Sequence, residues 1–207
     1  MKISKRLQAI ADLVDTKRVI DVGCDHGYLD IYLTLYKDCS CIATDISSNA
    51  MASCIDNIKK YHLENKISVM VTDGIAGIII NKDDTIVLSG MGTSTIMNIL
   101  KDKLLPDKII ISSHNHLEEL RRFMVSIGYI IDNEIFILER DISYIIIKFI
   151  KGKKAYNDYE YLLGPIMIKD INYRNYMLNK YQNILTQISD QNVDMKNYYL
   201  GIIKYLK

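Results

Sequence analysis

Residues 18–29, RVIDVGCDHGYL, decide the fold. A short apolar run ends in Asp21, and Gly23 and Gly27 then bracket a turn that contains Asp25. A hydrophobic strand that runs directly into a glycine-bearing loop and a helix is typical of the first unit of a parallel α/β sheet. Because such sheets bind ligands at the carboxyl ends of their strands near the switch point, this loop is the expected cofactor site.

The first 150 residues alternate short apolar runs with longer amphipathic stretches, which predicts strand–helix units and a parallel sheet with helices on both faces. Strands are expected at residues 18–22, 41–44, 67–71, 85–88 and 108–112. Helices are expected at residues 28–36, 47–61, 75–80, 94–105 and 116–127, and an amphipathic helix is expected within residues 1–15.

After Gly128 the pattern changes to two strands within residues 129–150, joined around Arg140 and Asp141. So short a link allows only an antiparallel pair. A parallel sheet with a C-terminal antiparallel hairpin is the order of the Rossmann-like class I methyltransferase domain. We therefore expect this α/β domain at residues 1–154 and, from the apolar periodicity after residue 167, a coiled-coil-like helical extension at residues 155–207.

The 207-residue chain is 49% hydrophobic, enough for a substantial core, and its net charge of +1 is unevenly distributed. Residues 1–150 hold 17 Lys and Arg against 20 Asp and Glu, whereas residues 151–207 hold 9 against 5, together with nine of the fifteen tyrosines. Basic and aromatic residues together can bind nucleic acid. The alternative is a compositional bias towards Ile, Lys, Asn and Tyr throughout the chain.

No apolar run is long enough to span a membrane, and the N-terminus does not resemble a signal peptide, so we expect a soluble cytoplasmic protein. The four cysteines lack CxxC spacing, which favours reduced, mostly buried thiols over a zinc site or disulfides. His114 and His116 have no clustered third ligand, so no metal site is predicted.

The expected cofactor loop is acidic, and its glycines have neither the G-x-G-x-x-G spacing nor a P-loop lysine. Asp21 and Asp25 would repel a pyrophosphate but not the ammonium and sulfonium groups of S-adenosyl-L-methionine. Asp45, which ends the second strand, can accept from both ribose hydroxyls of a nucleoside. Asp73 with Gly74, after the third strand, can accept from an adenine amino group. Each acid alone is as readily a helix cap or turn residue.

The fourth strand runs into Gly90, Met91 and Gly92, where two glycines allow a close approach of the backbone to a ligand. In the expected fold this strand end faces the transferable methyl group. The alternative is a simple strand-to-helix turn with Met91 in the core.

The chain resembles the bacterial tRNA (adenine(22)-N1)-methyltransferases, the TrmK family. The resemblance is carried by SKRLQAIADLV, DVGCDHGYLDIYL, TDGI, LSGMGTSTI, LEELRRFMVSIGYII and YLLGPIMI, in this order over nearly the whole chain. It implies S-adenosyl-L-methionine as cofactor, tRNA as partner and a helical extension after the catalytic domain, with no membrane and no obligate protein partner. The chain departs from the family pattern at Thr93 and at residues 112–115, near the expected pocket for the target base.

The resemblance implies methylation of N1 of an adenine, a lone-pair nucleophile that needs placement and desolvation more than activation. Asp25 is the first candidate for the proton acceptor and His26 the second, although either could hold the cofactor's amino-acid end instead. Arg6 could bind the cofactor carboxylate or an RNA phosphate, or lie on a solvated helix face. The expected cofactor-binding residues are Arg6, Asp21, Gly23, Cys24, Asp25, His26, Gly27, Tyr28, Asp45, Ile46, Ser47, Asp73, Gly74, Gly90, Met91 and Gly92.

Two other classes of function remain open from the sequence. One is a methyltransferase of the same fold that acts on another RNA position, a small molecule or a protein. The other is a non-catalytic RNA-binding relative that has kept the cofactor fold.

Overall fold

The structure is a computed structural model that describes residues 1–139 and 142–207. The connection predicted around Arg140 and Asp141 lies outside the described residues. The chain divides into two compact units, Met1–Lys154 and Ala155–Lys207, which are described separately below.

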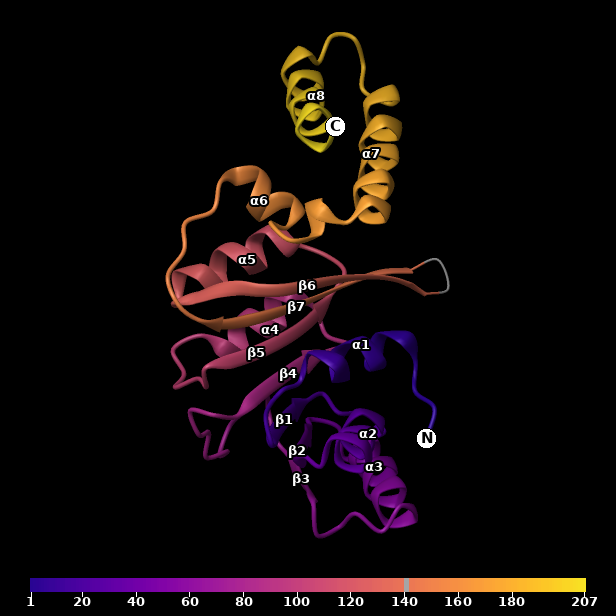
Figure 1. Cartoon of the computed structure of the whole chain (residues 1–207), viewed down its shortest axis with the longest axis vertical. Helices are drawn as coiled ribbons and strands as arrows, with labels where there is room; N and C mark the ends of the chain where they lie inside the picture. The colour runs from indigo at the N-terminus through magenta and orange to yellow at the C-terminus, as the bar shows by residue number, and fades with distance from the viewer. Residues whose placement is uncertain (140–141) are drawn as a thin grey trace. The chain divides into compact units, whose positions relative to one another are not determined.

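The first unit is built on one sheet, which has seven strands within the described residues, in the order β3-β2-β1-β4-β5-β7-β6 (Figure 1). The first five strands are mutually parallel, and β7 pairs antiparallel with both β5 and β6. The predicted parallel sheet with a terminal antiparallel pair is therefore confirmed. The strands are β1 (Arg18–Val22), β2 (Ser40–Asp45), β3 (Ile67–Val71), β4 (Thr85–Ser89), β5 (Lys108–Ser113), β6 (Tyr129–Glu139) and β7 (Ile142–Lys151).

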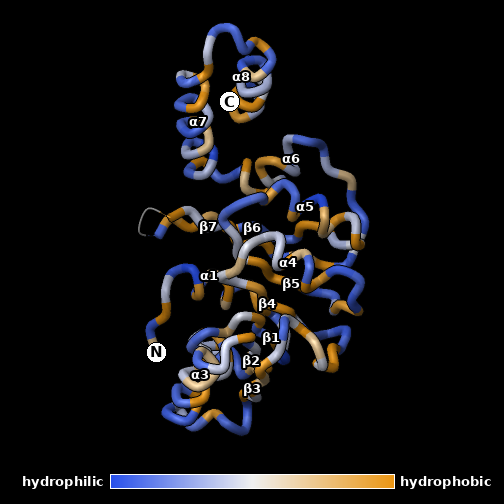
Figure 2. The backbone as a smooth tube through the Cα atoms, turned by 180° about the vertical axis from the view of Figure 1, so that it is seen from behind, coloured by the Kyte–Doolittle hydropathy of each residue, from blue (hydrophilic) through white to orange (hydrophobic). Residues whose placement is uncertain are grey.

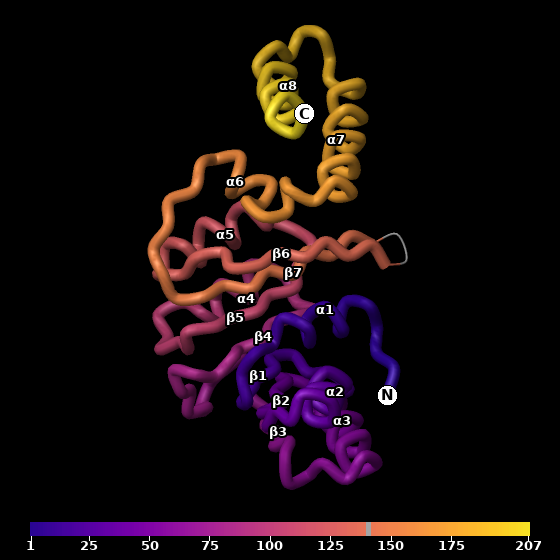
Figure 3. Tube along the Cα trace, viewed as in Figure 1, coloured from indigo at the N-terminus to yellow at the C-terminus, as the bar shows by residue number. Residues whose placement is uncertain are grey.

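The path of the chain sets the helix layers (Figure 3). The chain moves outward from β1 through β2 to β3, returns to β4 beside β1, and then moves outward the other way to β5. Since parallel crossovers are right-handed, opposite directions of travel place α2 and α3 on one face of the sheet and α4 on the other. The helices of this unit are α1 (Lys5–Leu13), α2 (Tyr28–Lys37), α3 (Ser48–Lys60), α4 (Thr93–Leu100) and α5 (Leu117–Ser126).

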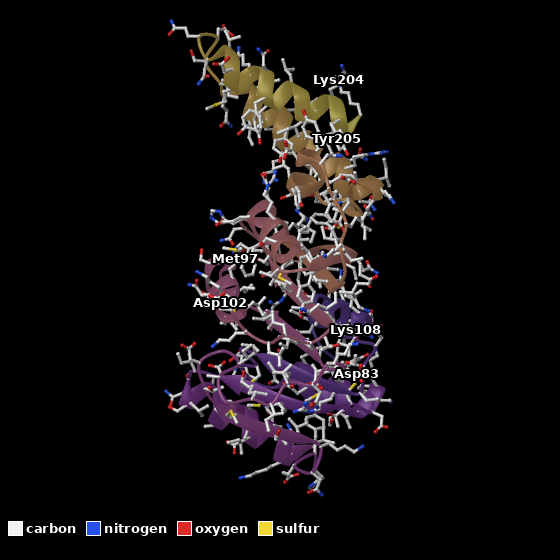
Figure 4. The ribbon with its side chains drawn as sticks, turned by 90° about the vertical axis from the view of Figure 1, so that its left-hand side faces the viewer. Asp83, Met97, Asp102, Lys108, Lys204 and Tyr205 are labelled. Atoms are coloured by element: carbon white, nitrogen blue, oxygen red, sulfur yellow. The ribbon has the colours of Figure 1, made fainter. Side chains whose placement is uncertain are left out.

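The core follows the central strands, which Figure 2 shows as hydrophobic. Residues 86–88 of β4 and 109–111 of β5 are fully buried, as expected of parallel strands covered on both faces. At the amino-terminal edge of the sheet, Asp83 and Lys108 lie near each other in Figure 4, because Lys108 pairs with the first residue of β4. The opposite, carboxyl edge carries the loops predicted to bind the cofactor.

Two helix predictions differ from the structure. The short helix expected at residues 75–80 is wrong: this segment forms a turn and an irregular stretch. Gly74 and Gly77 adopt φ angles of +61° and +75°, which a right-handed helix does not allow. Helix α4 ends at Leu100 rather than at residue 105, and the positive φ of +56° at Asp102 prevents its continuation.

The second unit is helical, with α6 (Asp158–Leu163), a short 3₁₀ turn η1 (Met167–Lys169), α7 (Ile171–Thr186) and α8 (Val193–Leu206). Helices α7 and α8 pack against each other in an antiparallel arrangement (Figure 1). Helix α6 was not predicted, although its capping box, formed by Asn157 and Glu160, is a sequence signal for a helix start. The coiled-coil geometry stays a prediction.

The helices among residues 1–139 and 142–207 include none that is long and apolar enough to cross a membrane. Cys24, Cys39, Cys41 and Cys54 are free and buried, as predicted.

Candidate functional site

A cleft of about 590 Å³ lies at the carboxyl edge of the sheet, around the ends of β1, β2 and β4. Strands β1 and β4 are neighbours, yet the chain runs out to β3 between them, so the cleft occupies the switch point where open α/β sheets bind ligands. The predicted residues that line it are Arg6, Asp21, Gly23, Cys24, Asp25, His26, Tyr28, Asp45, Ile46, Asp73, Gly74, Gly90 and Met91.

Three predicted residues do not line the cleft: Gly27, Ser47 and Gly92. Each is the cap residue at the start of a helix that follows a strand. Gly27 adopts a φ of +70°, and the Ser47 hydroxyl accepts a hydrogen bond from the Ala50 N–H at 3.3 Å. These residues therefore shape the loops around the cleft without forming its wall.

Sequence reasoning missed the cleft residues Leu7, Val22, Leu29, Thr44, Thr72, Ser89, Thr95 and Ile99. Most are direct neighbours of predicted residues, so a wider window at each strand end would have included them. Thr95 and Ile99 are different, because they lie one helical turn apart on α4 and reach the cleft only through the packing of that helix.

The turn after β1 is held by backbone hydrogen bonds to β2. The N–H groups of Gly23 and Cys24 both donate to the Thr44 carbonyl, at 2.8 and 2.9 Å. Gly23 adopts a φ of +80°, and a Cβ there would lie 2.8 Å from the Met91 side chain. The positive φ therefore favours glycine at this position, whereas the flexible end of the Met91 side chain can move to make room for a Cβ.

Asp45 is fixed in place by two backbone donors. Its Oδ1 accepts from the Ser47 N–H at 2.8 Å, and its Oδ2 accepts from the Asp25 N–H at 3.3 Å. An ionised carboxylate has about four acceptor positions, so one remains on each oxygen. This carboxylate is preorganised to accept from two neighbouring hydroxyls, as in a ribose.

The loop after β3 is fastened to β2 and to α4. The Thr44 hydroxyl donates to the Gly74 carbonyl at 3.2 Å. Gly74 has a φ of +61°, and a Cβ there would lie 2.9 Å from the Ile99 side chain. Asp73 is thus held at the wall of the cleft by a loop that leaves no room for a larger neighbour.

Asp21 lies on the cleft wall but is only 3% exposed. Burial raises the pKa of its carboxyl to about 7, while a hydrogen bond with Asp30 and the charge of Arg6 oppose this rise. Burial raises the pKa of Asp30, which is fully buried, well above its usual range, and the nearby Asp21 charge adds to the effect. Neither spacing nor composition predicts that Asp30 interacts with Asp21.

Asp25 and His26 are the most accessible titratable groups of the β1 turn. Their side chains are 69% and 49% exposed, and His26 Nε2 lies 3.6 Å from Asp25 Oδ1. The His26 ring is also 5.6 Å from that of Tyr28, while its carbonyl accepts from Asn57. Both side chains line the cleft and are accessible from it.

The cleft carries more acid than base. Asp21, Asp25, Asp45 and Asp73 line it, and Arg6 is the one permanently cationic side chain among its lining residues. Such a site is poorly suited to a pyrophosphate and well suited to a nucleoside that carries a positive charge. The described residues contain no cluster of His, Cys, Asp and Glu that could hold a metal ion.

The chain is similar to several known proteins. Residues 3–147 match the family described as a methyltransferase domain. A Mycoplasma genitalium protein, provisionally named a tRNA methyltransferase, is 33% identical over 88% of this chain and 86% of its own. The Bacillus subtilis tRNA (adenine(22)-N(1))-methyltransferase is 30% identical over 83% of this chain and 77% of its own. The chain is also similar to the structure of M. capricolum TrmK in complex with S-adenosyl-homocysteine, with 28% sequence identity and a TM-score of 0.87. The alignment covers all of this chain and 98% of the M. capricolum chain.

Proposed function

Because the chain belongs to the methyltransferase-domain family, and within it to the tRNA (adenine(22)-N1)-methyltransferases, we propose that its acidic cleft binds S-adenosyl-L-methionine and directs a methyl group to N1 of the adenine at position 22 of tRNA. The observation that carries the proposal is the Asp45 carboxylate, held by two backbone N–H groups at the carboxyl end of β2, in the cleft that occupies the switch point of the sheet. It supplies what a nucleoside cofactor requires.

We assign the cofactor contacts from the geometry of the cleft. Asp45 accepts from the ribose hydroxyls, and the adjacent Ile46, which is 72% exposed, covers the adenine. Asp73 accepts from the adenine amino group. Gly74 has no Cβ and therefore leaves space for the adenine ring.

The β1 turn and the β4 turn surround the other end of the cofactor. Gly23, Cys24 and Tyr28 contact it in the first of these turns, while Gly90 and Met91 face it from the second. The negative charge of Asp21 favours its ammonium group, and Arg6 pairs with its carboxylate. Gly27, Ser47 and Gly92 act through the shape of the loops and helix starts.

The cofactor supplies an activated methyl group, and the chain's own residues place and desolvate the adenine that receives it. Methylation of N1 makes the adenine ring cationic. A carboxylate beside the exocyclic amino group stabilises this charge and accepts a proton from it. Asp25 is suited to this role by its exposure to the cleft, and His26, 3.6 Å away, is the alternative.

We assign tRNA binding in part to the second unit. It holds six Lys and Arg against five Asp and Glu, and nine of the fifteen tyrosines, among them Tyr198, which is 55% exposed on α8. Three further lysines, Lys151, Lys153 and Lys154, directly precede it in the chain. Lysine charges release counterions from phosphates, and tyrosine rings stack on bases. A tRNA substrate also implies a cytoplasmic location. We propose no obligate protein partner.

The test is tritium transfer from labelled S-adenosyl-L-methionine to two unmodified tRNA transcripts that differ only in adenine or guanine at position 22. Label on the adenine transcript alone is the expected result. Label on both would move the reaction to another RNA position. Label on neither, with cofactor bound, would favour a small-molecule or protein substrate, or a non-catalytic RNA-binding protein.

A further inference from the structure

An aromatic corner adjoins the cofactor cleft on the side of the β4 turn. The Arg6 guanidinium, which lines the cleft, lies 5.2 Å from the centre of the Tyr144 ring. Its Nη1 also lies 4.0 Å from the position that a Cβ on Gly90 would occupy. Arg6 therefore connects the end of β4 with the Tyr144 ring on β7.

The second side of the corner is His114. Its ring centre lies 6.4 Å from that of Tyr144, with an angle of 76° between the two planes. His114 follows directly after the end of β5, and β7 brings Tyr144 beside it, since Ser113 pairs with Ile145. Tyr144 is partly buried and His114 is exposed, so the corner can be reached from solvent on the His114 side.

The loop that carries His114 is anchored on both sides. The buried Thr93 hydroxyl lies 2.9 Å from the Ser113 hydroxyl and donates to the Asn115 carbonyl at 2.8 Å. These contacts join the loop to the start of α4, just after the β4 turn. The His114 side chain is therefore presented by a fixed backbone rather than by a free loop.

We propose that Tyr144 and His114 form the stacking site for the target adenine, with Arg6 between this site and the cofactor. The inference rests on the proposed function and deepens it. A purine extruded from tRNA loses its stacking partners, and an aromatic ring replaces them. Because the planes of Tyr144 and His114 are 76° apart, the purine stacks on one ring and meets the other at its edge. Gly90 has no side chain to block the approach, and among the described residues other than its chain neighbours only the Arg6 Nη1 comes within 4.0 Å of the position that a Cβ would occupy.

The two rings also explain the role of the residues around them. Thr93 and Ser113 orient the loop and do not touch the base. Arg6 holds one side of Tyr144 through its positive charge, which the ring face attracts. Tyr144 and His114 therefore contact the base directly, and their removal affects base placement before it affects the cofactor.

The experiment compares the full-length variants His114→Ala, His114→Phe, Tyr144→Ala and Tyr144→Phe with His62→Ala, an exposed histidine after α3. Methyl transfer is measured as KM and kcat for the adenine-22 transcript, and cofactor binding by calorimetry with S-adenosyl-homocysteine. Stacking on one aromatic side chain corresponds to roughly a five- to hundredfold effect on base binding. We expect KM for tRNA to rise in this range in both alanine variants, with recovery in the phenylalanine variants and unchanged affinity for S-adenosyl-homocysteine.

A second readout uses a transcript with 2-aminopurine at position 22, whose fluorescence reports stacking. The wild-type complex should show a stacked base, and Tyr144→Ala should not. Unchanged KM and fluorescence in both alanine variants would overturn the inference while methylation by the wild type keeps the proposed function. An equal loss in Tyr144→Phe, or a matching loss of cofactor affinity, would also overturn it. If the wild type methylates no adenine in tRNA, the proposed function fails and this inference fails with it.

Discussion

The carboxyl groups of Asp21, in β1, and Asp30, in the first turn of α2, are buried and interact with each other, and neither oxygen of Asp30 has another hydrogen-bond partner among the described residues. Two ionised carboxylates are acceptors only, so a hydrogen bond between them requires a proton on one of them. Burial raises the pKa of Asp30 well above its usual range, and the nearby Asp21 charge adds to the rise, so we expect Asp30 to hold the proton and donate to Asp21. The buried pair then carries one negative charge rather than two, and Asp21 is the member that lines the cleft.

This pair predicts a fall in stability with rising pH. Burial raises the pKa of Asp21 from 3.8 to about 7 in the folded protein, and that of Asp30 also rises. The folded state then keeps protons that the unfolded chain has lost, so this contribution to stability is present in full below pH 3.8 and is lost as the pH rises to about 7.

The variant Asp30→Asn tests this dependence, because the amide still donates to Asp21 but no longer titrates. We expect its Tm to fall less than that of the wild type between pH 5 and pH 8. Parallel profiles would contradict this, and the exposed Asp56→Asn serves as the control.

Substitution of Asp45 should selectively lower the affinity of the protein for its cofactor. A hydrogen bond to a charged group contributes about 1.5–3 kcal/mol, so Asp45→Asn should weaken binding of S-adenosyl-homocysteine roughly ten- to a hundredfold in calorimetry. The amide also disturbs the two backbone donors, Ser47 and Asp25. Asp38→Asn at the opposite end of β2, where Asp38 pairs with Lys66 at 2.8 Å, should bind normally. Equal affinity in both variants would remove Asp45 from the cofactor site.

Substitution of Asp25 should lower the rate of methyl transfer without lowering the affinity for cofactor or tRNA. Asp25→Asn should slow methyl transfer by roughly ten- to a hundredfold, the usual range for a group that exchanges a proton, while cofactor and tRNA affinities stay near those of the wild type. Single-turnover transfer to the adenine-22 transcript measures this. Asp83→Asn, at the amino-terminal edge of the sheet, is the matched control (Figure 4). Normal transfer by Asp25→Asn with slow transfer by His26→Ala would assign the role to His26.

The sequence was most informative where a local pattern determines the structure. The apolar runs at residues 18–22 and 67–71 became strands with the expected bounds, and the acids at strand ends, Asp45 and Asp73, came together at the cleft. The carboxyl ends of parallel strands all lie at the same edge of a sheet, so the proximity of these acidic residues follows from strand order alone.

The failures depend on three-dimensional packing. The isoleucines of residues 75–80 suggested a helical face, but Ile79 is 81% exposed because the glycines before it turn the chain. The Asp21–Asp30 pair and the contribution of Thr95 and Ile99 arise from the angle at which α2 and α4 meet the sheet. The angle between a helix and the sheet cannot be predicted from residue spacing or composition.

Replacing Gly27 by alanine should have a steric cost and a conformational cost, and the two can be measured separately. It has a φ of +70°, and a Cβ there would lie 2.5 Å from Cys54 Sγ. Gly77 has a similar φ of +75° with nothing within 4 Å of such a Cβ. Gly77→Ala should lower the free energy of unfolding by about 1–2 kcal/mol, the cost of a left-handed alanine, and Gly27→Ala by clearly more. Urea unfolding of the Gly27→Ala/Cys54→Ala double variant should recover the difference. Additive losses would show that Cys54 is not the obstacle.

The second unit predicts a change in tRNA binding that leaves the cofactor unaffected. Lys180 on α7 and Lys204 on α8 are exposed, and Figure 4 shows Lys204 near the end of α8. Reversing both charges in Lys180→Glu/Lys204→Glu should reduce tRNA affinity by at least about tenfold and flatten its dependence on salt, because fewer counterions are released. Fluorescence anisotropy at several salt concentrations measures both effects.

The matched control for this charge reversal is Lys17→Glu/Lys82→Glu, which makes the same change of net charge at the amino-terminal edge of the sheet. These lysines pair with Asp38 and Asp107 at 3.8 and 3.7 Å, so their contribution to a distant phosphate is already reduced. If both double variants lose tRNA affinity equally, net charge rather than the helical unit attracts the RNA. A loss confined to Lys180→Glu/Lys204→Glu assigns the electrostatic contact to α7 and α8, because long-range attraction alone is screened within about 10 Å at ordinary salt.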